Sequence, residues 1–253
     1  MPIPRRIIQT HRDATMEPYL RQSWIDHHPD YEYRFFDDAD CRALIADRMP
    51  ELLGTYDVLP LAVQKADLFR YIALHEMGGL YADVDTVCLA PLHSYVDLAS
   101  EHLHVCPEMQ PSRWPGGAED YALHFCNPRQ FLQWTLCSPP GHPLLADVIE
   151  RIARLVAQYA PSELVLASEN MRTTLQLTGP HLFSNMIEVY LHKEGAAARL
   201  TLLPHLAWGA YPWEQCHPMF GPAIKVCHLF HGTWLGKPEQ LRMPAPLRLK
   251  QRY

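Results

Sequence analysis

The feature that most constrains the fold is a long amphipathic segment followed by two glycines and a short alternating segment. Residues 61–77 place apolar side chains at helical spacing and predict the longest helix of the chain. Gly78 and Gly79 favour a stop, and residues 80–88 then alternate as a strand does. A strand is also predicted over the aromatic-rich residues 31–36. The order strand, helix, strand predicts an α/β fold with a ligand at the strand ends.

The whole chain, 1–253, is predicted as one domain, because no internal repeat, low-complexity segment or linker divides it. Two proline-rich stretches, 107–115 and 211–222, are expected to form long loops. Residues 237–253 are expected to form a basic, proline-containing tail. The other expected elements are a strand within 3–10 and helices over 16–26, 38–48, 143–160 and 180–192.

Composition restricts the partners and the location. A formal net charge of −6 at pH 7 argues against a nucleic-acid partner, because such proteins need a basic face. The 7 cysteines are scattered and form no C-x-x-C pair, which predicts reduced thiols in a cytoplasmic protein. We expect no signal peptide and no membrane-spanning segment. The basic tail is a candidate for peripheral contact with anionic lipid at the inner face of the membrane.

The sequence Asp83-Val84-Asp85 lies in the alternating segment and carries the clearest chemistry. On a strand, both carboxylates would share one face with Tyr81. Carboxylates two residues apart on one face repel each other unless a positive charge lies between them. A hard divalent cation such as Mn²⁺ or Mg²⁺ suits oxygen ligands, and a diphosphate can complete its coordination. D-x-D alone is a weak signal, but its position after an apolar strand and two glycines strengthens it.

Two charged residues precede this motif on the predicted helix. Asp67 and Arg70 are three residues apart and therefore share a face. The alternative interpretation is an exposed surface ion pair, which would stabilise the fold by about 0–1 kcal/mol. Because the helix leads directly to the acidic motif, we expect the pair to contact a substrate hydroxyl or phosphate. Arg70→Ala is then expected to weaken substrate use more than stability.

These segments together resemble a known family. The sequence is ADLFRY at residues 66–71 and GGLYADVD at residues 78–85. This combination is similar to the DXD-containing sugar transferases of glycosyltransferase family 32, and the same core pattern recurs in bacterial glucosylating toxins. The similarity is clear over residues 64–91. It is weaker elsewhere and closes at residues 228–234.

The resemblance implies a single Rossmann-like domain of the GT-A type, with a mixed central sheet and flanking helices. It also implies metal-dependent transfer of a hexose from a UDP- or GDP-sugar, with retention at the anomeric carbon and Mn²⁺ or Mg²⁺ as cofactor. The expected acceptor is a glycan, a polysaccharide, a lipid-linked sugar or a protein. No nucleic-acid partner is expected.

The same resemblance implies roles for individual residues. Asp67, Arg70, Asp83 and Asp85 are the catalytic candidates: the first two would hold sugar hydroxyls, and Asp85 would bind the metal. Asp83 would contact the ribose or a metal-bound water, and Tyr81 would lie near the nucleotide or sugar. The donor-binding residues that it implies are Gln9, Thr10, His11, Asp67, Arg70, Tyr81, Asp83, Gln133 and Trp234. The metal ligands that it implies are Asp83, Asp85 and His228, with His231 as the alternative.

Two positions depart from the family pattern: His11 stands where many members carry tryptophan, and Gln133 where asparagine is frequent. Two other readings compete with the transferase. Asp83-Val84-Asp85-Thr86-Val87 also fits the motif of haloacid-dehalogenase-like phosphatases, but that reading needs downstream acidic ligands, and no aspartate follows Asp147. An inactive sugar-binding protein of the same fold is the third, and the intact set of charged residues argues against it.

Overall fold

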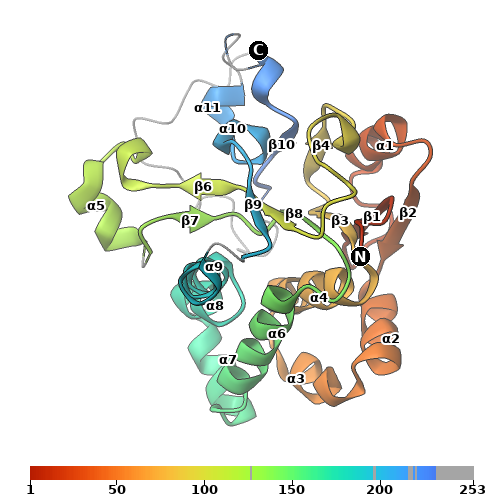
Figure 1. The fold of residues 1–253 in the computed structure, drawn as a ribbon. Helices are drawn as coiled ribbons and strands as arrows, with labels where there is room; N and C mark the ends of the chain where they lie inside the picture. Colours follow the sequence, from red (N-terminus) through yellow and green to blue (C-terminus); the bar gives the residue numbers. More distant parts are fainter. Residues whose placement is uncertain (126, 196–197, 216–218, 220, 232–253) are drawn as a thin grey trace.

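A six-stranded mixed sheet forms the centre of the molecule (Figure 1). The computed structural model describes residues 1–125, 127–195, 198–215, 219 and 221–231. In spatial order, the sheet consists of β2 (Glu32–Phe36), β1 (Arg6–Thr10), β3 (Gly79–Ala82), β8 (Thr135–Ser138), β5 (Leu103–Val105) and β9 (Leu200–Leu202). β1 is parallel to both of its neighbours, whereas β8 is antiparallel to β3 and β5. The predicted α/β class with a mixed sheet is confirmed.

Two short antiparallel ribbons accompany this sheet. β4 (Thr86–Cys88) pairs with β10 (Val226–His228), and β6 (Pro107–Met109) pairs with β7 (Gln130–Phe131). The second ribbon extends away from the body and leads to α5 (Gly117–His124) (Figure 1). The long loop predicted over 107–115 is therefore wrong in part, because its first residues pair with β7.

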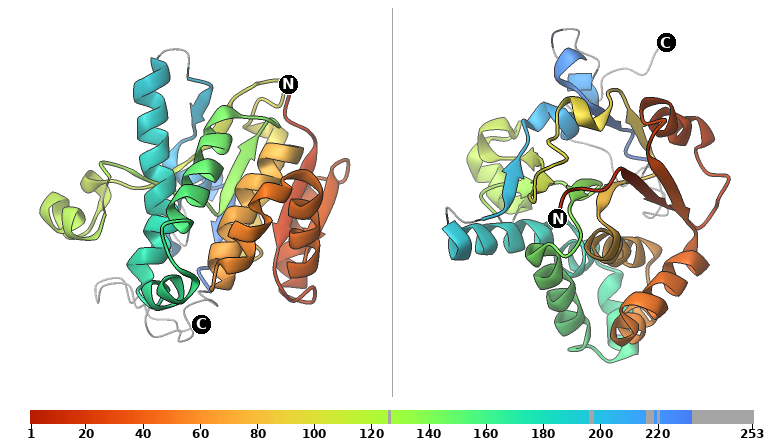
Figure 2. Two further views of the ribbon diagram at one scale, coloured as in Figure 1. Left: turned by 90° about the horizontal axis from the view of Figure 1, so that it is seen from below. Right: turned by 45° about the vertical axis from the view of Figure 1, so that its right-hand side comes forward.

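Helices cover both faces of the sheet. α4 (Ala62–Met77) packs against α6 (Pro143–Val156), which packs against α9 (Pro180–Glu194), so the three lie along one face (Figure 2). The opposite face is covered by α1 (Pro18–His27) and α10 (His205–Trp208) together with the ribbon of β4 and β10. The other helices in the described part of the chain are α2 (Asp38–Arg48), α3 (Leu53–Val58), α7 (Pro161–Ser168), α8 (Met171–Leu177) and α11 (Pro212–Gln215).

The alternation of strand side chains divides the core in two. Ile8 and Tyr81 point to the core beneath α4, α6 and α9, whereas Ile7 and Leu80 point to the core that contains Trp24 on α1. All five side chains are fully buried. Because both faces of β1 and β3 are covered by apolar side chains, these two strands are held rigidly, and so is the loop that follows β3.

Two glycines end α4 and begin β3, as the sequence predicts. Gly78 caps the helix with φ 63°, and its N–H donates to the carbonyl of Leu74 at 2.9 Å. Gly79 has φ 109°, and a Cβ at this position would lie 2.6 Å from the carbonyl oxygen of Arg6 on β1. Only glycine therefore fits the close approach that places β3 next to β1.

The continuous strand predicted over 80–88 is wrong. β3 ends at Ala82 and β4 begins at Thr86, and the acidic motif forms a turn between them. The N–H of Asp83 donates to the carbonyl of Trp134, and the N–H and Oγ1 of Thr86 donate to the carbonyl of Asp83. The chain has to turn here because β3 belongs to the central sheet, whereas β4 pairs with β10 in a separate ribbon.

Within the described residues, no helix combines the length and the apolar composition needed to cross a membrane. The predicted basic tail, 237–253, lies outside the described residues.

Candidate active site

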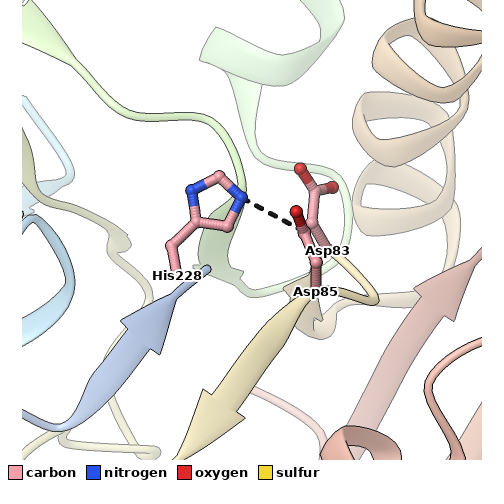
Figure 3. A group of neighbouring side chains, drawn as sticks. All are labelled: Asp83, Asp85 and His228. Carbon is pink, nitrogen blue, oxygen red and sulfur yellow. Dashed lines mark hydrogen bonds and ion pairs between the residues drawn. The ribbon is translucent and has the colours of Figure 1, made fainter. Parts of the chain in front are cut away.

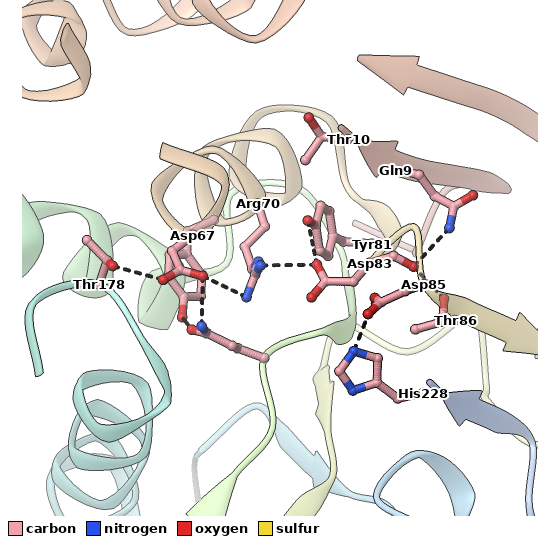
Figure 4. A network of polar contacts seen from close by, with 12 residues as sticks. Gln9, Thr10, Asp67, Arg70, Tyr81, Asp83, Asp85, Thr86, Thr178 and His228 are labelled. Atoms are coloured by element: carbon pink, nitrogen blue, oxygen red, sulfur yellow. Dashed lines mark hydrogen bonds and ion pairs between the residues drawn. The ribbon is translucent and has the colours of Figure 1, made fainter. Parts of the chain in front are cut away.

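The candidate site lies where β3 ends and the turn with the acidic motif begins. α4 contributes Asp67 and Arg70, the turn contributes Asp83 and Asp85, and β10 contributes His228 (Figure 4). β1 and β3 are parallel, so their carboxyl ends meet at this edge of the sheet. Ligands of open α/β sheets bind at such an edge.

A chain of ion pairs connects the helix to the turn. Arg70 Nη1 lies 3.0 Å from Asp67 Oδ1, and Arg70 Nη2 lies 3.0 Å from Asp83 Oδ1. The guanidinium also lies over the ring of Tyr81, and the hydroxyl of Tyr81 donates to Asp83 Oδ1 at 2.8 Å. Only 4% of the Arg70 side chain and 2% of the Asp67 side chain are exposed. The alternative interpretation as an exposed surface ion pair is therefore wrong.

Besides Arg70, two side chains hold Asp67 in place. Gln133 Nε2 donates to Oδ1 at 2.8 Å, and Thr178 Oγ1 donates to Oδ2 at 2.8 Å. Gln133 is fixed in turn because its Oε1 accepts a hydrogen bond from the hydroxyl of Tyr71. The structure thus places Gln133 in contact with the site, through Asp67.

Burial and hydrogen bonding give the three carboxylates different electrostatic environments. Burial raises the pKa of Asp67 to about 7, although Arg70 and the hydrogen bonds to Thr178 and Gln133 act in the opposite direction. Burial also raises the pKa of Asp83 against the attraction of Arg70. Burial acts in the same sense on Asp85, but the hydrogen bond and charge of His228 outweigh it and lower the pKa of Asp85 to about 2. Asp85 is therefore ionised at neutral pH.

Asp83, Asp85 and His228 form a group that can hold a metal ion (Figure 3). Each offers one ligand atom, and these atoms all lie within 4.8 Å of one another. His228 Nε2 lies 3.1 Å from Asp85 Oδ1, and its ring stacks on Trp134 with 4.5 Å between the ring centroids. Two carboxylates and one imidazole are a donor set that suits Mn²⁺ or Mg²⁺. The residues present therefore fit the implied cation.

Comparison with known proteins identifies this arrangement. Residues 15–102 match the family model described as the glycosyltransferase sugar-binding region containing the DXD motif. Over this range the chain is similar to the DXD-containing glycosyltransferases. The matched range includes the aspartate and arginine of α4 and both aspartates of the turn. The resemblance drawn from the sequence is confirmed.

Two curated relatives are initiation-specific alpha-1,6-mannosyltransferases. That of Candida albicans is 31% identical over 212 residues, which cover 76% of this chain and 54% of the relative. That of Schizosaccharomyces pombe is 29% identical over 259 residues, which cover 92% of this chain and 64% of the relative. The chain thus spans between one half and two thirds of the length of these relatives.

A solved structure named PaToxG Glycosyltransferase shares the fold, with a TM-score of 0.51 and 14% sequence identity over 77% of this chain and 70% of that chain. At this identity the likeness concerns the fold alone. It confirms the GT-A type that the sequence resemblance implies. The phosphatase and the inactive binding protein are not favoured by any of these comparisons.

His231, the alternative metal ligand, contacts Asp85 through its backbone and not through its ring. Its backbone N–H donates to Asp85 Oδ2 at 3.0 Å, whereas its Nδ1 lies 3.1 Å from Glu17 Oε1. Among the described residues, the group whose ligand atoms lie within 4.8 Å of one another contains His228 and not His231.

The other predicted donor residues differ in how close they come to the site. Gln9 is fully buried, and its Nε2 donates to the carbonyl of Asp83 at 3.1 Å, so it supports the turn. The hydroxyl of Thr10 donates to the carbonyl of Phe36, which turns it into the protein. His11 is partly exposed just beyond β1, with its Nδ1 accepting from a backbone N–H two residues later. Trp234 lies outside the described residues.

Sequence reasoning gave no role to three residues that the structure places in the site. Thr178 and Tyr71 hold Asp67, directly or through Gln133, and Trp134 carries the His228 ring. Thr178 is 111 positions from its partner, so no local pattern connects them. A signal for Trp134 was available, because it directly follows Gln133 in the chain.

Proposed function

We propose that this chain is a metal-dependent, retaining glycosyltransferase that moves a hexose from a UDP- or GDP-sugar to an acceptor hydroxyl. Mannose is the first candidate for the sugar, since two relatives are named as mannosyltransferases. The acceptor is a glycan, a polysaccharide, a lipid-linked sugar or a protein. The proposal concerns this chain alone, which spans only part of those relatives.

One observation carries the proposal: the ion-pair chain of Asp67, Arg70 and Asp83 ends beside the group of Asp83, Asp85 and His228. The first set offers carboxylate oxygens and a guanidinium, which suit the hydroxyls of a sugar. The second set offers ligands for a cation, which suits a diphosphate. Asp83 belongs to both sets. The sugar of a nucleotide sugar would therefore find complementary groups on one side of Asp83, and its diphosphate would find them on the other.

Asp83, Asp85 and His228 would hold Mn²⁺ or Mg²⁺, whose positive charge would neutralise the departing nucleoside diphosphate. Asp67 and Arg70 would orient the sugar, and their burial excludes water from competing for it. In the transfer, the bond from the anomeric carbon to the diphosphate oxygen breaks and a bond to the acceptor oxygen forms on the same face. The acceptor proton passes to the departing diphosphate, so no side chain has to act as a nucleophile.

The test is hydrolysis and transfer with a panel of UDP- and GDP-sugars, including GDP-mannose, in Mn²⁺ and in EDTA. We expect metal-dependent release of one nucleotide, and GDP from GDP-mannose is the first candidate. Equal rates in EDTA would refute the metal dependence. Tight donor binding without release in the presence of acceptors from every class would instead support a binding protein.

A cytoplasmic location, with peripheral contact at the inner face of the membrane, is part of the proposal. Its support is that Cys41, Cys88, Cys106 and Cys137 are buried and form no disulfide among the described residues. Co-sedimentation of the full chain and of a chain truncated at residue 236 with phosphatidylserine vesicles tests the membrane contact. Equal sedimentation of the two chains would remove the tail from the proposal.

A further inference from the structure

One nitrogen of the proposed metal ligand His228 has no hydrogen-bond partner among the residues that the structure describes. Its Nε2 faces Asp85, whereas its Nδ1 points away from both aspartates (Figure 3). This Nδ1 is buried and has no hydrogen-bond partner among the described residues. A histidine that binds a metal almost always donates its second N–H to a carboxylate, a carbonyl or a water, which fixes the ring and raises its basicity. We therefore expect Nδ1–H of His228 to donate a hydrogen bond to an acceptor.

Glu108 on β6 is a buried carboxylate with no positive side chain bonded to it within the described part of the chain. It is 8% exposed, and its two oxygens accept hydrogen bonds from Gln130 Nε2 at 2.9 Å and from the hydroxyl of Tyr211 at 3.1 Å. Both donors are neutral. Burial of a carboxylate is costly unless hydrogen bonds or a positive group compensate it, so a further N–H donor would stabilise the ionised form of Glu108.

His228 is one of the groups that interact electrostatically with Glu108. Burial raises the pKa of Glu108, and the groups that oppose this effect are Gln130, Tyr211, His228 and His205. His205 is already engaged, because its Nε2 lies 3.2 Å from Glu214 Oε2 and its Nδ1 lies 3.0 Å from the carbonyl of Pro107. His228 is the remaining neighbour, and its Nδ1 has no hydrogen-bond partner among the described residues.

Packing holds the two groups in a fixed relation. The ring of Tyr211, whose hydroxyl holds Glu108, stacks on Phe230 with a centroid distance of 5.7 Å and an interplanar angle of 5°. Phe230 in turn contacts the His228 ring at 4.1 Å. The carboxylate and the imidazole are therefore connected through the rings of Tyr211 and Phe230.

We propose that Glu108 is a positioning residue for His228: its carboxylate accepts the hydrogen bond of Nδ1–H, directly or through one water, and so presents Nε2 to the cation. The inference rests on the proposed metal site. Glu108 itself touches neither the donor nor the metal. This role would connect the β6–β7 ribbon to the active site, although both strands lie well beyond the acidic motif in the sequence.

Glu108→Gln tests the proposal, and Glu214→Gln is the matched control. An amide at position 108 keeps the size of the side chain and can donate to Gln130 Oε1, which lacks a partner among the described residues. Glu214 is a second buried carboxylate near the same ribbon, but its partners are His205, the backbone N–H of Tyr211 and Arg113. Both variants lose one buried negative charge, and only the first removes the charge that faces His228.

The readouts are Mn²⁺ affinity by calorimetry, with and without GDP, and the nitrogen modulation of bound Mn²⁺ in electron spin echo spectra of protein with ¹⁵N-labelled histidine. In Glu108→Gln we expect a loss of affinity of about 10- to 100-fold and a weaker nitrogen modulation. Glu214→Gln is expected to keep both. Neither readout requires turnover, so a failed donor assay leaves the test intact.

Wild-type affinity and modulation in Glu108→Gln would overturn the proposal, as would equal losses in Glu214→Gln. If Glu108→Gln does not fold, Tyr211→Phe replaces it, because that change removes one hydrogen bond to Glu108 and keeps the ring that stacks on Phe230. A smaller loss of affinity in the same direction is expected, and no loss would count against the proposal. A wild-type protein that binds no Mn²⁺ under either condition would overturn the metal site as well.

Discussion

Arg70→Ala tests whether the centre of the site is an internal ion-pair chain. In the folded protein the guanidinium separates two carboxylates, with nitrogen-to-oxygen distances of 3.0 Å to Asp67 and 3.0 Å to Asp83. Removal of Arg70 leaves Asp67, whose side chain is 2% exposed, without a bonded positive partner among the described residues, and it also removes the ion pair of Asp83. Removal of one partner from such a buried pair costs about 3–5 kcal/mol.

This magnitude is measurable in a chain of this size. A change of 1 kcal/mol shifts Tm by about 2–4 °C in proteins of 150–250 residues, so Arg70→Ala is expected to lower Tm by roughly 6–20 °C. Urea unfolding at pH 8, where Asp67 is ionised, gives the free energy directly. The sequence alone favoured a larger effect on substrate use than on stability, and the burial of the pair adds a large expected loss of stability.

The double variant Asp67→Asn with Arg70→Ala supplies the control. It removes one of the two uncompensated charges, so we expect it to be more stable than Arg70→Ala alone. A loss below about 1 kcal/mol in Arg70→Ala would refute the reasoning, because it would mean that the pair behaves as an exposed one.

Three further changes test other parts of the site. Asp85→Asn should abolish the Mn²⁺ affinity measured by calorimetry while the chain still folds, because Asp85 is 17% exposed at the rim; unchanged affinity would remove it from the metal site. The pKa of Asp67 is raised to about 7 in the folded state, so the folded state binds more protons and the free energy of unfolding should fall by roughly 4 kcal/mol between about pH 4 and 7. Asp67→Asn should lack this component in urea unfolding at several pH values, and an unchanged pH dependence would contradict the assignment. Gly79→Ala should cost at least about 2 kcal/mol, since the residue has φ 109° and its Cβ would lie 2.6 Å from the Arg6 oxygen. Gly54→Ala on α3, with no atom within 4 Å of the new Cβ, should be neutral or stabilising, and equal losses in the two variants would refute this account.

The elements with strong local patterns could be predicted from the sequence. The helix expected over 38–48 is α2 (Asp38–Arg48), and the helix expected over 61–77 differs from α4 (Ala62–Met77) by one residue. The order of strands in the sheet could not be predicted in this way. β5 (Leu103–Val105) and β9 (Leu200–Leu202) are three residues each and pair across almost 100 positions, so neither carries a local signal of its partner.

The residues of the site divide in the same way, into those with a local sequence pattern and those brought together by tertiary packing. Asp67 and Arg70 were found because residues three apart on a helix share a face, and His228 was found only through the family resemblance. Thr178 on the loop before α9 and Glu108 on β6 could not be found, because tertiary packing brings them to the site. Periodicity was misleading for residues 80–88, since both faces of β3 are buried and alternation there does not distinguish a core side from an active side.

The break between β3 and β4 explains how one short motif serves two purposes. On a continuous strand, Asp83 and Asp85 would share a face and the same neighbours. In the turn, Asp83 faces Arg70 and Tyr81, and burial raises its pKa. Asp85 instead faces His228, and its pKa falls to about 2. Because the turn gives each carboxylate its own partners, one is suited to the sugar side of a donor and the other to a cation. Asp85→Asn is therefore expected to act on metal affinity, whereas Arg70→Ala removes the shared partner of Asp67 and Asp83 and is expected to act on stability as well as on the sugar side.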